Sequence, residues 1–268
     1  MMLLDYGTQL SYEPILLSIG SLRKPRLREI AHITFSLFTT FEFFMKCTPK
    51  EYYTKALRDN GGVEKWEAMS DDAKESLTMY GIITSDSQLQ ELYVKMFDFF
   101  FEENVRYANG FFILFRDIPE NPNDDIPIES ITGIISENNF LQVLDIIQQV
   151  CCIHSKADES ADDQKFKNSL ARKLFERMQK ALKEQEEQKE SKADKNLSIP
   201  NIISSVASIH PTYNLINIWD LTVFQLLDAF RRMQSNTAYD IELVRVSVWG
   251  DEKKVFDPTL WHKNYYDT

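Results

Sequence analysis

A stretch of dense, balanced charge divides this chain and sets the strongest limit on its fold. Residues 155–196 hold 11 Lys and Arg and 10 Asp and Glu. Large apolar residues recur every four positions from Phe166 to Leu182, which predicts an amphipathic helix, and none follows before Leu197. Because the second half of this stretch cannot bury a core, we expect three parts. These are an N-terminal domain at 1–153, a charged amphipathic helix and linker at 154–197, and a C-terminal domain at 198–268.

Composition favours helices over a turn-dense β fold. Hydrophobic residues make up 43% of the chain and aromatic residues 12%, which is too apolar for a disordered protein. Glycine and proline are scarce, at 8 and 9 residues. The predicted class is therefore mainly α, and close to all-α. It comprises a multi-helix N-terminal domain, in which short β-strands remain open, and a smaller helical C-terminal domain.

Start and stop signals for helices are frequent. A capping box at Thr48–Glu51 opens a helix that Gly61 and Gly62 end, and Ser70 opens another that Tyr80 and Gly81 end. Ser85–Gln88 opens a longer helix through about Arg106, and Ser136 caps one more.

Strands are harder to identify from this sequence. Pro14–Ile19 is the best strand candidate, whereas Phe111–Phe115 and Ile131–Ile135 fit either a strand or a buried helix edge. Residues 239–249 alternate like a strand at Val244, Val246 and Val248, yet their spacing also fits a helix, which we favour.

Net charge and cysteine usage limit the environment and the partners. A charge of −11 and a pI near 4.9 oppose binding to nucleic-acid backbones and to anionic membranes. Three cysteines, two of them adjacent, do not form a disulfide framework, and the apolar stretches are too short to cross a bilayer. With no signal peptide visible, we expect a cytoplasmic protein that binds neither nucleic acid nor membrane.

Catalytic patterns are missing from the sequence. There is no glycine-rich phosphate loop, and Cys151, Cys152 and His154 form the only thiol–imidazole cluster. That cluster fits core packing better than catalysis, and a structural zinc site needs four ligands. The acidic stretch 117–125 lacks the glycine and the distal glutamate of a calcium loop. We expect no enzyme, no metal and no cofactor.

Aromatic residues carry the interaction hypothesis. Phenylalanines gather at 35–44 and 97–101 in greater number than one helical stripe can bury. Burial of both helices in the N-terminal core explains most of them. The alternative is that part of this surface, including Phe41, Phe44 and Phe99, is a seat for an apolar helix of a client or a second copy. A basic cluster at Arg23–Arg28 leaves contact with phosphate open, although we favour pairing with acids on another face or subunit.

Two segments resemble the tail assembly chaperones of long-tailed bacteriophages. Residues 214–234 have an aromatic lead-in at Trp219, a cap at Asp220 or Thr222, and a helix with Gln225, Phe230, Arg231 and Gln234. Residues 18–30 are similar to the entry segment of such proteins in phages of Gram-positive hosts.

The resemblance implies a helical, non-catalytic protein of the host cytoplasm. Such chaperones bind the tape measure protein, keep it soluble and help recruit tail tube subunits, as the G protein and its G-T extension do in the lambda-type system. Self-association is a further option. The alternative is a phage structural or adaptor protein, of connector or baseplate type, that stays in the virion.

The C-terminal helix then divides into a core face and a partner face. The spacing of Val223, Leu226, Leu227, Phe230 and Met233 predicts that they face the core. Phe224, Arg231 and Arg232 lie on the other side, and Phe224 is close to Trp219 across the turn. We expect Trp219, Phe224, Arg231 and Arg232 to contact a partner.

Overall fold

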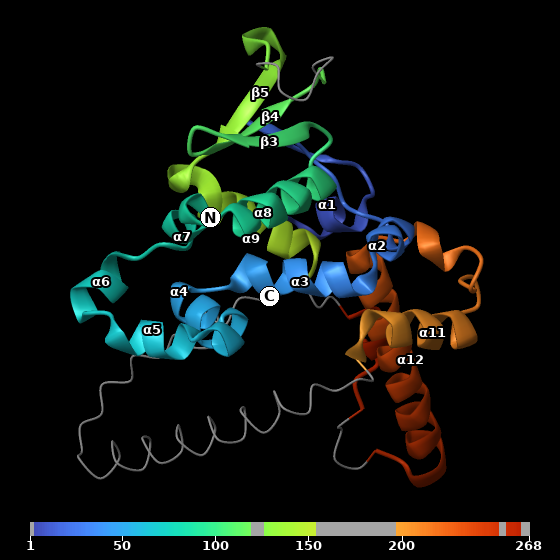
Figure 1. Ribbon diagram of the computed structural model, residues 1–268. Coiled ribbons are helices and arrows are strands. Elements are labelled where there is room, and N and C mark those ends of the chain that lie inside the picture. Colours follow the sequence, from blue (N-terminus) through green and yellow to red (C-terminus); the bar gives the residue numbers. More distant parts are fainter. Residues whose placement is uncertain (1–2, 119–125, 154–196, 252–255, 264–268) are drawn as a thin grey trace, which may run out of the picture. The chain divides into compact units, whose positions relative to one another are not determined.

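The chain folds as two compact units. The computed structural model describes residues 3–118, 126–153, 197–251 and 256–263. Unit 1 contains residues 1–153, 219–225 and 264–268, and unit 2 contains residues 154–218 and 226–263. Figure 1 shows the elements in chain order. The charged helix and linker expected at 154–197 lie outside the described residues, except for Leu197.

Helices make up most of unit 1. They are α1 (Tyr6–Leu10), α2 (Leu27–Ile33), α3 (Phe35–Lys46), α4 (Pro49–Glu51), α5 (Gly62–Ala68), α6 (Asp71–Ser76), α7 (Met79–Ser85), α8 (Ser87–Phe100) and α9 (Glu137–Val150). A π-helical turn at Tyr52–Ala56 and a 3-10 turn at Arg58–Asn60 continue the chain after α4.

Side-chain caps start these helices where the sequence indicates. Thr48 and Glu51 form the predicted reciprocal capping box, with both backbone N–H groups donating across 3.2 Å. Ser70 caps α6 and Ser136 caps α9. The predicted stop at Tyr80 and Gly81 is wrong, because the Thr78 hydroxyl accepts from Gly81 N at 3.0 Å and caps a new helix, α7.

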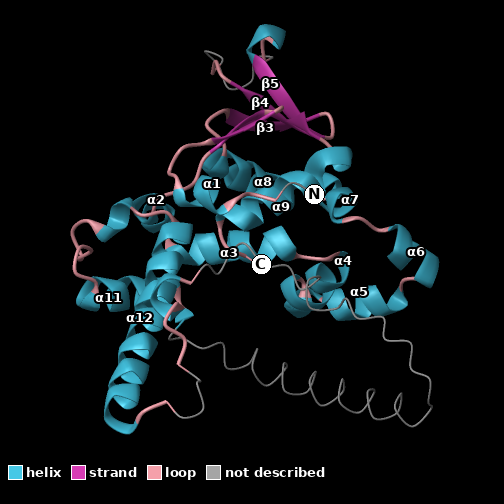
Figure 2. Ribbon diagram, turned by 180° about the vertical axis from the view of Figure 1, so that it is seen from behind, coloured by secondary structure: helices cyan, strands magenta, loops and turns pink. Residues whose placement is uncertain are grey.

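Two antiparallel sheets contradict the expected mainly α class. Strand β1 (Ile15–Leu17) pairs with β2 (Gly20–Leu22), and β3 (Asn104–Ala108), β4 (Phe111–Phe115) and β5 (Ile131–Ile135) form a sheet in that order. The described residues therefore form a mixed α/β fold in which helices predominate, as Figure 2 shows.

Strand β3 occupies residues that the sequence assigns to a helix ending near Arg106. The helix α8 ends earlier because Arg23 N donates to Phe100 O at 2.7 Å and Glu102 N donates to Ser21 O at 2.9 Å. The chain then turns at Asn109 and Gly110, whose φ angles are 53° and 84°. An Asn–Gly pair is the strongest short-range signal of a hairpin, so the sequence already contained the evidence for this turn.

An aromatic cluster forms the centre of unit 1. Helices α8 and α9 lie between the three-stranded sheet and α3 in both views (Figures 1 and 2). The ring of Tyr93 on α8 lies 5.6 Å from that of Phe140 on α9 and 6.3 Å from that of Phe112 on β4. Its hydroxyl donates to Phe44 O at 2.8 Å, so the buried polar atom is satisfied.

Unit 2 is helical in its described part. Helix α11 (Ile199–Ile209) buries Ile202, Ile203 and Val206. Helix α12 (Val223–Trp249), which belongs to unit 2 from Leu226 on, extends through the residues whose structure the sequence left ambiguous. The preference for helix at 239–249 is confirmed. No helix in the part of the chain that the structure describes combines the length and apolar character needed to cross a membrane.

Candidate partner-binding sites

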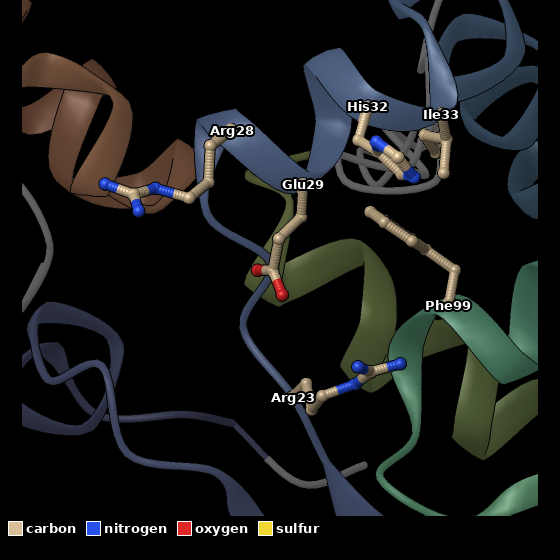
Figure 3. A pocket seen from close by; sticks show the side chains of 6 residues that line it. All are labelled: Arg23, Arg28, Glu29, His32, Ile33 and Phe99. Carbon is tan, nitrogen blue, oxygen red and sulfur yellow. The ribbon is translucent and has the colours of Figure 1, made fainter.

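A cavity of about 420 Å³ opens beside the ring of Phe99 in unit 1. Four of its lining residues come from one helix, α2: Arg28, Glu29, His32 and Ile33. Phe99 comes from the last turn of α8, and Arg23 from the segment between β2 and α2. Figure 3 shows the rings of Phe99 and His32 directed toward each other, with Arg28 pointing away from the other five side chains.

Arg23 is incompletely paired. Its Nη2 donates to Asp98 O at 2.6 Å, whereas its Nε is buried and has no hydrogen-bond partner among the described residues. A buried donor left unsatisfied costs about 1–3 kcal/mol, and more when it is charged. This cost makes Arg23 a candidate for contact with a ligand.

The other charged groups of the cavity have partners within unit 1. The Glu29 carboxylate accepts from Arg26 N at 2.7 Å and completes the cap of α2. Arg28 forms an ion pair with Asp220, and Arg26 Nη1 lies 3.5 Å from the same carboxylate. Two members of the basic cluster, Arg26 and Arg28, thus pair with an acid far along the chain, whereas the side chains of Arg23 and Lys24 donate to backbone carbonyls.

Asp220 belongs to a segment, Trp219–Gln225, that packs within unit 1 although it lies far along the chain. Leu27 N donates to Leu221 O at 2.9 Å, and Arg26 and Thr222 form an antiparallel bridge. Gln225 Nε2 donates to Leu10 O at 2.7 Å. This return segment is therefore held by backbone bonds as well as by charge.

The return segment contains two of the predicted partner-binding residues. Phe224 is only 3% exposed, and its ring lies 5.9 Å from that of Tyr6. The expectation that Phe224 stays open for a partner is wrong, because the return segment turns this ring into unit 1. Trp219 is half-buried.

The remaining predicted residues fall in different surroundings. Phe41 is buried, Phe44 is half-buried, and the half-buried ring of Phe99 lies 6.1 Å from that of Phe41. Arg231 is exposed, and Arg232 Nε donates to Asp228 at 3.0 Å. Phe99 is the member of this set that lines the cavity described above.

An exposed apolar face on α12 escaped the sequence analysis as a candidate site. Ile241, Val244, Val248 and Trp249 are 63%, 61%, 65% and 76% exposed. The first three recur at i, i+3 and i+7, the spacing of one helix face. That spacing was visible in the sequence, but it could not tell an exposed face from a buried one.

A second hollow, of about 710 Å³, lies in unit 1 between the β1–β2 turn and one face of α9. Leu16 and Ile19 line it from the hairpin, and Leu141 and Ile146 from the helix. Its wall is largely apolar, and Leu16 and Leu141 are exposed there.

Two cysteines, Cys47 and Cys151, are buried in unit 1. Burial, with Glu51 nearby, raises the pKa of the Cys47 thiol to about 12, and burial raises the pKa of Cys151 as well. Such thiols are poor nucleophiles because little thiolate forms near neutral pH. Within the described residues, no group of three or more His, Cys, Asp or Glu could hold a metal ion.

Comparison with known proteins gives a match to a family model. The family model described as YomV second domain matches residues 187–266, less than a third of the chain. That family is phage-derived, so the match indicates a phage protein. The matched range includes the return segment and all of α12. No curated protein and no solved structure matches the chain.

Proposed function

We propose that this chain is a non-catalytic phage tail assembly chaperone of the host cytoplasm. It binds the tape measure protein, keeps it soluble and helps recruit tail tube subunits. The exposed apolar face of α12 carries this proposal, because it lies inside the range matched by a phage-derived family.

The physical basis is transfer of apolar surface from water. An amphipathic client helix lays its apolar stripe along a second apolar stripe, and anchors at i, i+3 and i+7 fix the register. Ile241, Val244 and Val248 supply such anchors, and Trp249 adds a large aromatic surface at the end of α12. The net charge of −11 keeps a complex with an aggregation-prone client in solution.

Co-expression with the tape measure protein of the same genome tests the proposal. The native chain should move most of that protein into the soluble fraction, and V244D combined with V248D should abolish this effect by placing two charges on the face. The control is I128D, because Ile128 is an exposed apolar residue of unit 1. Circular dichroism checks that α12 remains helical. Equal client solubility with and without the native chain would eliminate the chaperone function.

A structural or adaptor protein of the virion is the second candidate. The same exposed face would then be covered permanently by a neighbouring subunit, as in obligate interfaces. Mass spectrometry of purified particles separates the two functions. A chaperone is absent from the finished virion, whereas an adaptor is present at a fixed ratio to the other tail proteins.

A further inference from the structure

The cavity beside Phe99 combines an apolar wall with a cation that lacks a full set of partners. Phe99 and Ile33 supply the apolar wall, and Arg23 supplies the cation. A volume of about 420 Å³ is within the range of sites that hold small organic groups.

Of the charged side chains that line the cavity, Arg23 is the one that remains open to a ligand. Arg28 points away and pairs with Asp220, and Glu29 accepts the capping hydrogen bond from Arg26 N (Figure 3). Among the described residues, Arg23 has no carboxylate within ion-pair distance, and the one hydrogen bond of its side chain goes to a backbone carbonyl. The exposed imidazole of His32 adds a polar group on the α2 side.

We propose that this cavity binds a partner protein through a carboxylate that neighbours an aromatic or branched apolar side chain. The apolar group packs between Phe99 and Ile33, and the carboxylate draws the Arg23 guanidinium toward it and gives Nε an acceptor. A doubly charged phosphate fits less well, because the Glu29 carboxylate also lines the cavity and the wall is mainly apolar.

The remainder of the molecule makes this recognition selective. In a chain with a net charge of −11, an acidic segment is repelled from most of the surface. A cavity that places one incompletely paired guanidinium beside an apolar wall is therefore a specific seat for such a segment. Its lining residues lie outside the range 187–266, so the proposal goes beyond the chaperone function and does not depend on it.

The proposal is tested by titrating the full chain with 3-phenylpropanoate. NMR signals of the Ile33 methyl groups and the His32 ring report the binding. We expect saturable shifts at both residues. The isosteric 3-phenylpropanamide should bind about tenfold more weakly, because it lacks the charge. Acetate and inorganic phosphate should give no saturable shift. Equal binding of the amide, binding of phosphate alone, or no shift at Ile33 and His32 would each overturn the proposal.

Variants locate the interaction. R23Q should weaken 3-phenylpropanoate about tenfold, whereas R116Q, at an exposed arginine of unit 1, should leave it unchanged. If R23Q fails to fold, I33E provides the same test, since it places a like charge against the ligand. Retained affinity in the folded R23Q or I33E variant would contradict the assignment.

Peptides then distinguish the two sources of the carboxylate. One peptide ends in a free C-terminal Phe, and the other has an internal Phe–Asp pair and an amidated end. The site is supported if either peptide shifts the Ile33 and His32 signals and if this binding is lost in R23Q. The peptide that binds then identifies the source of the carboxylate. Failure of both peptides, when 3-phenylpropanoate binds, would limit the cavity to small molecules and refute the protein partner.

Discussion

Two apolar helix surfaces in this protein have opposite environments. On α8, Tyr93, Phe97 and Phe100 are fully buried, and the rings of Tyr93 and Phe97 lie against Phe140 of α9 and Phe112 of β4. On the second half of α12, Ile241, Val244 and Val248 keep more than half of their surface exposed. Both surfaces show helical spacing in the sequence. The difference teaches that periodicity identifies which side chains share a face, whereas the covering of that face depends on other elements.

Evidence of different kinds supports the two proposed binding surfaces. The α12 face exposes Ile241, Val244 and Val248 and lies in the matched residues, and it suits the apolar stripe of a long helix. The cavity beside Phe99 is small and partly cationic, and it suits one side chain with a carboxylate.

The largest expected effect comes from opening the aromatic core. The ring of Phe97 lies 5.0 Å from that of Phe112 and 5.9 Å from that of Tyr93, with no exposed surface. F97A should lower the free energy of unfolding by about 3–5 kcal/mol, because it leaves a cavity. W249A, on the exposed face, should change it by less than about 0.5 kcal/mol. Urea unfolding of both variants provides the measurement, and similar losses would show that the α12 face is also buried.

A second pair of variants examines the start of α12. Phe224 is buried against Tyr6, whereas Phe230 is half-buried. F224A should therefore cost about 3 kcal/mol and F230A about 1–2 kcal/mol. This order is the reverse of the one that the helical spacing predicts. Thermal melting of the two variants decides between the orders, and an earlier melt for F230A would restore the sequence-based assignment.

The smallest effect concerns a carboxylate within the helical layer of unit 1. Burial raises the pKa of Glu42 above its ordinary 4.5, and Lys46 only partly opposes this. The folded state therefore binds a proton on the Glu42 carboxyl more tightly than the unfolded state does. Above the folded pKa, the buried negative charge lowers the free energy of unfolding. That loss of stability decreases as the pH falls toward 4.5.

E42Q should therefore raise Tm at pH 7 by about 1–2 °C, and the gain should vanish near pH 4. E91Q is the control, because Glu91 is an exposed residue of α8. Melting curves at pH 7 and pH 4 give the comparison. A pH-independent gain in E42Q would show that removal of the charge is not its cause.

Sequence reasoning succeeded where the deciding contacts are local. Thr48 with Glu51, Ser70 with Ala73, and Ser136 with Asn139 each cap a helix across three residues. Because both partners stand in one short motif, the sequence contains all the information that the cap needs. The continuation of α12 through Val244 and Val248 also follows from spacing along one helix.

The errors lie where distant residues compete with local preference. Helix α8 stops at Phe100, since the backbone around Phe100–Glu102 pairs with Ser21–Arg23. The chain continues as a helix through Gly81 because Thr78 caps α7. The hydroxyl of Tyr80 also ties this helix to the sheet, since it donates to Gly110 O and Ile135 O. The Asn109–Gly110 turn between β3 and β4 was readable in the sequence, but the point at which α8 gives way to β3 depends on the strands with which that backbone pairs.

The sequence by itself determined the caps, the helical faces and the acidic character of this protein, because these properties depend on residues within a few positions of one another or on composition alone. Only the tertiary structure decided that Trp219–Gln225 packs with Arg26 and Arg28 in unit 1, that Phe224 is buried, and that Arg23 keeps an unsatisfied Nε beside Phe99. Burial and long-range pairing depend on two surfaces at once, and the spacing along one segment describes only one of them.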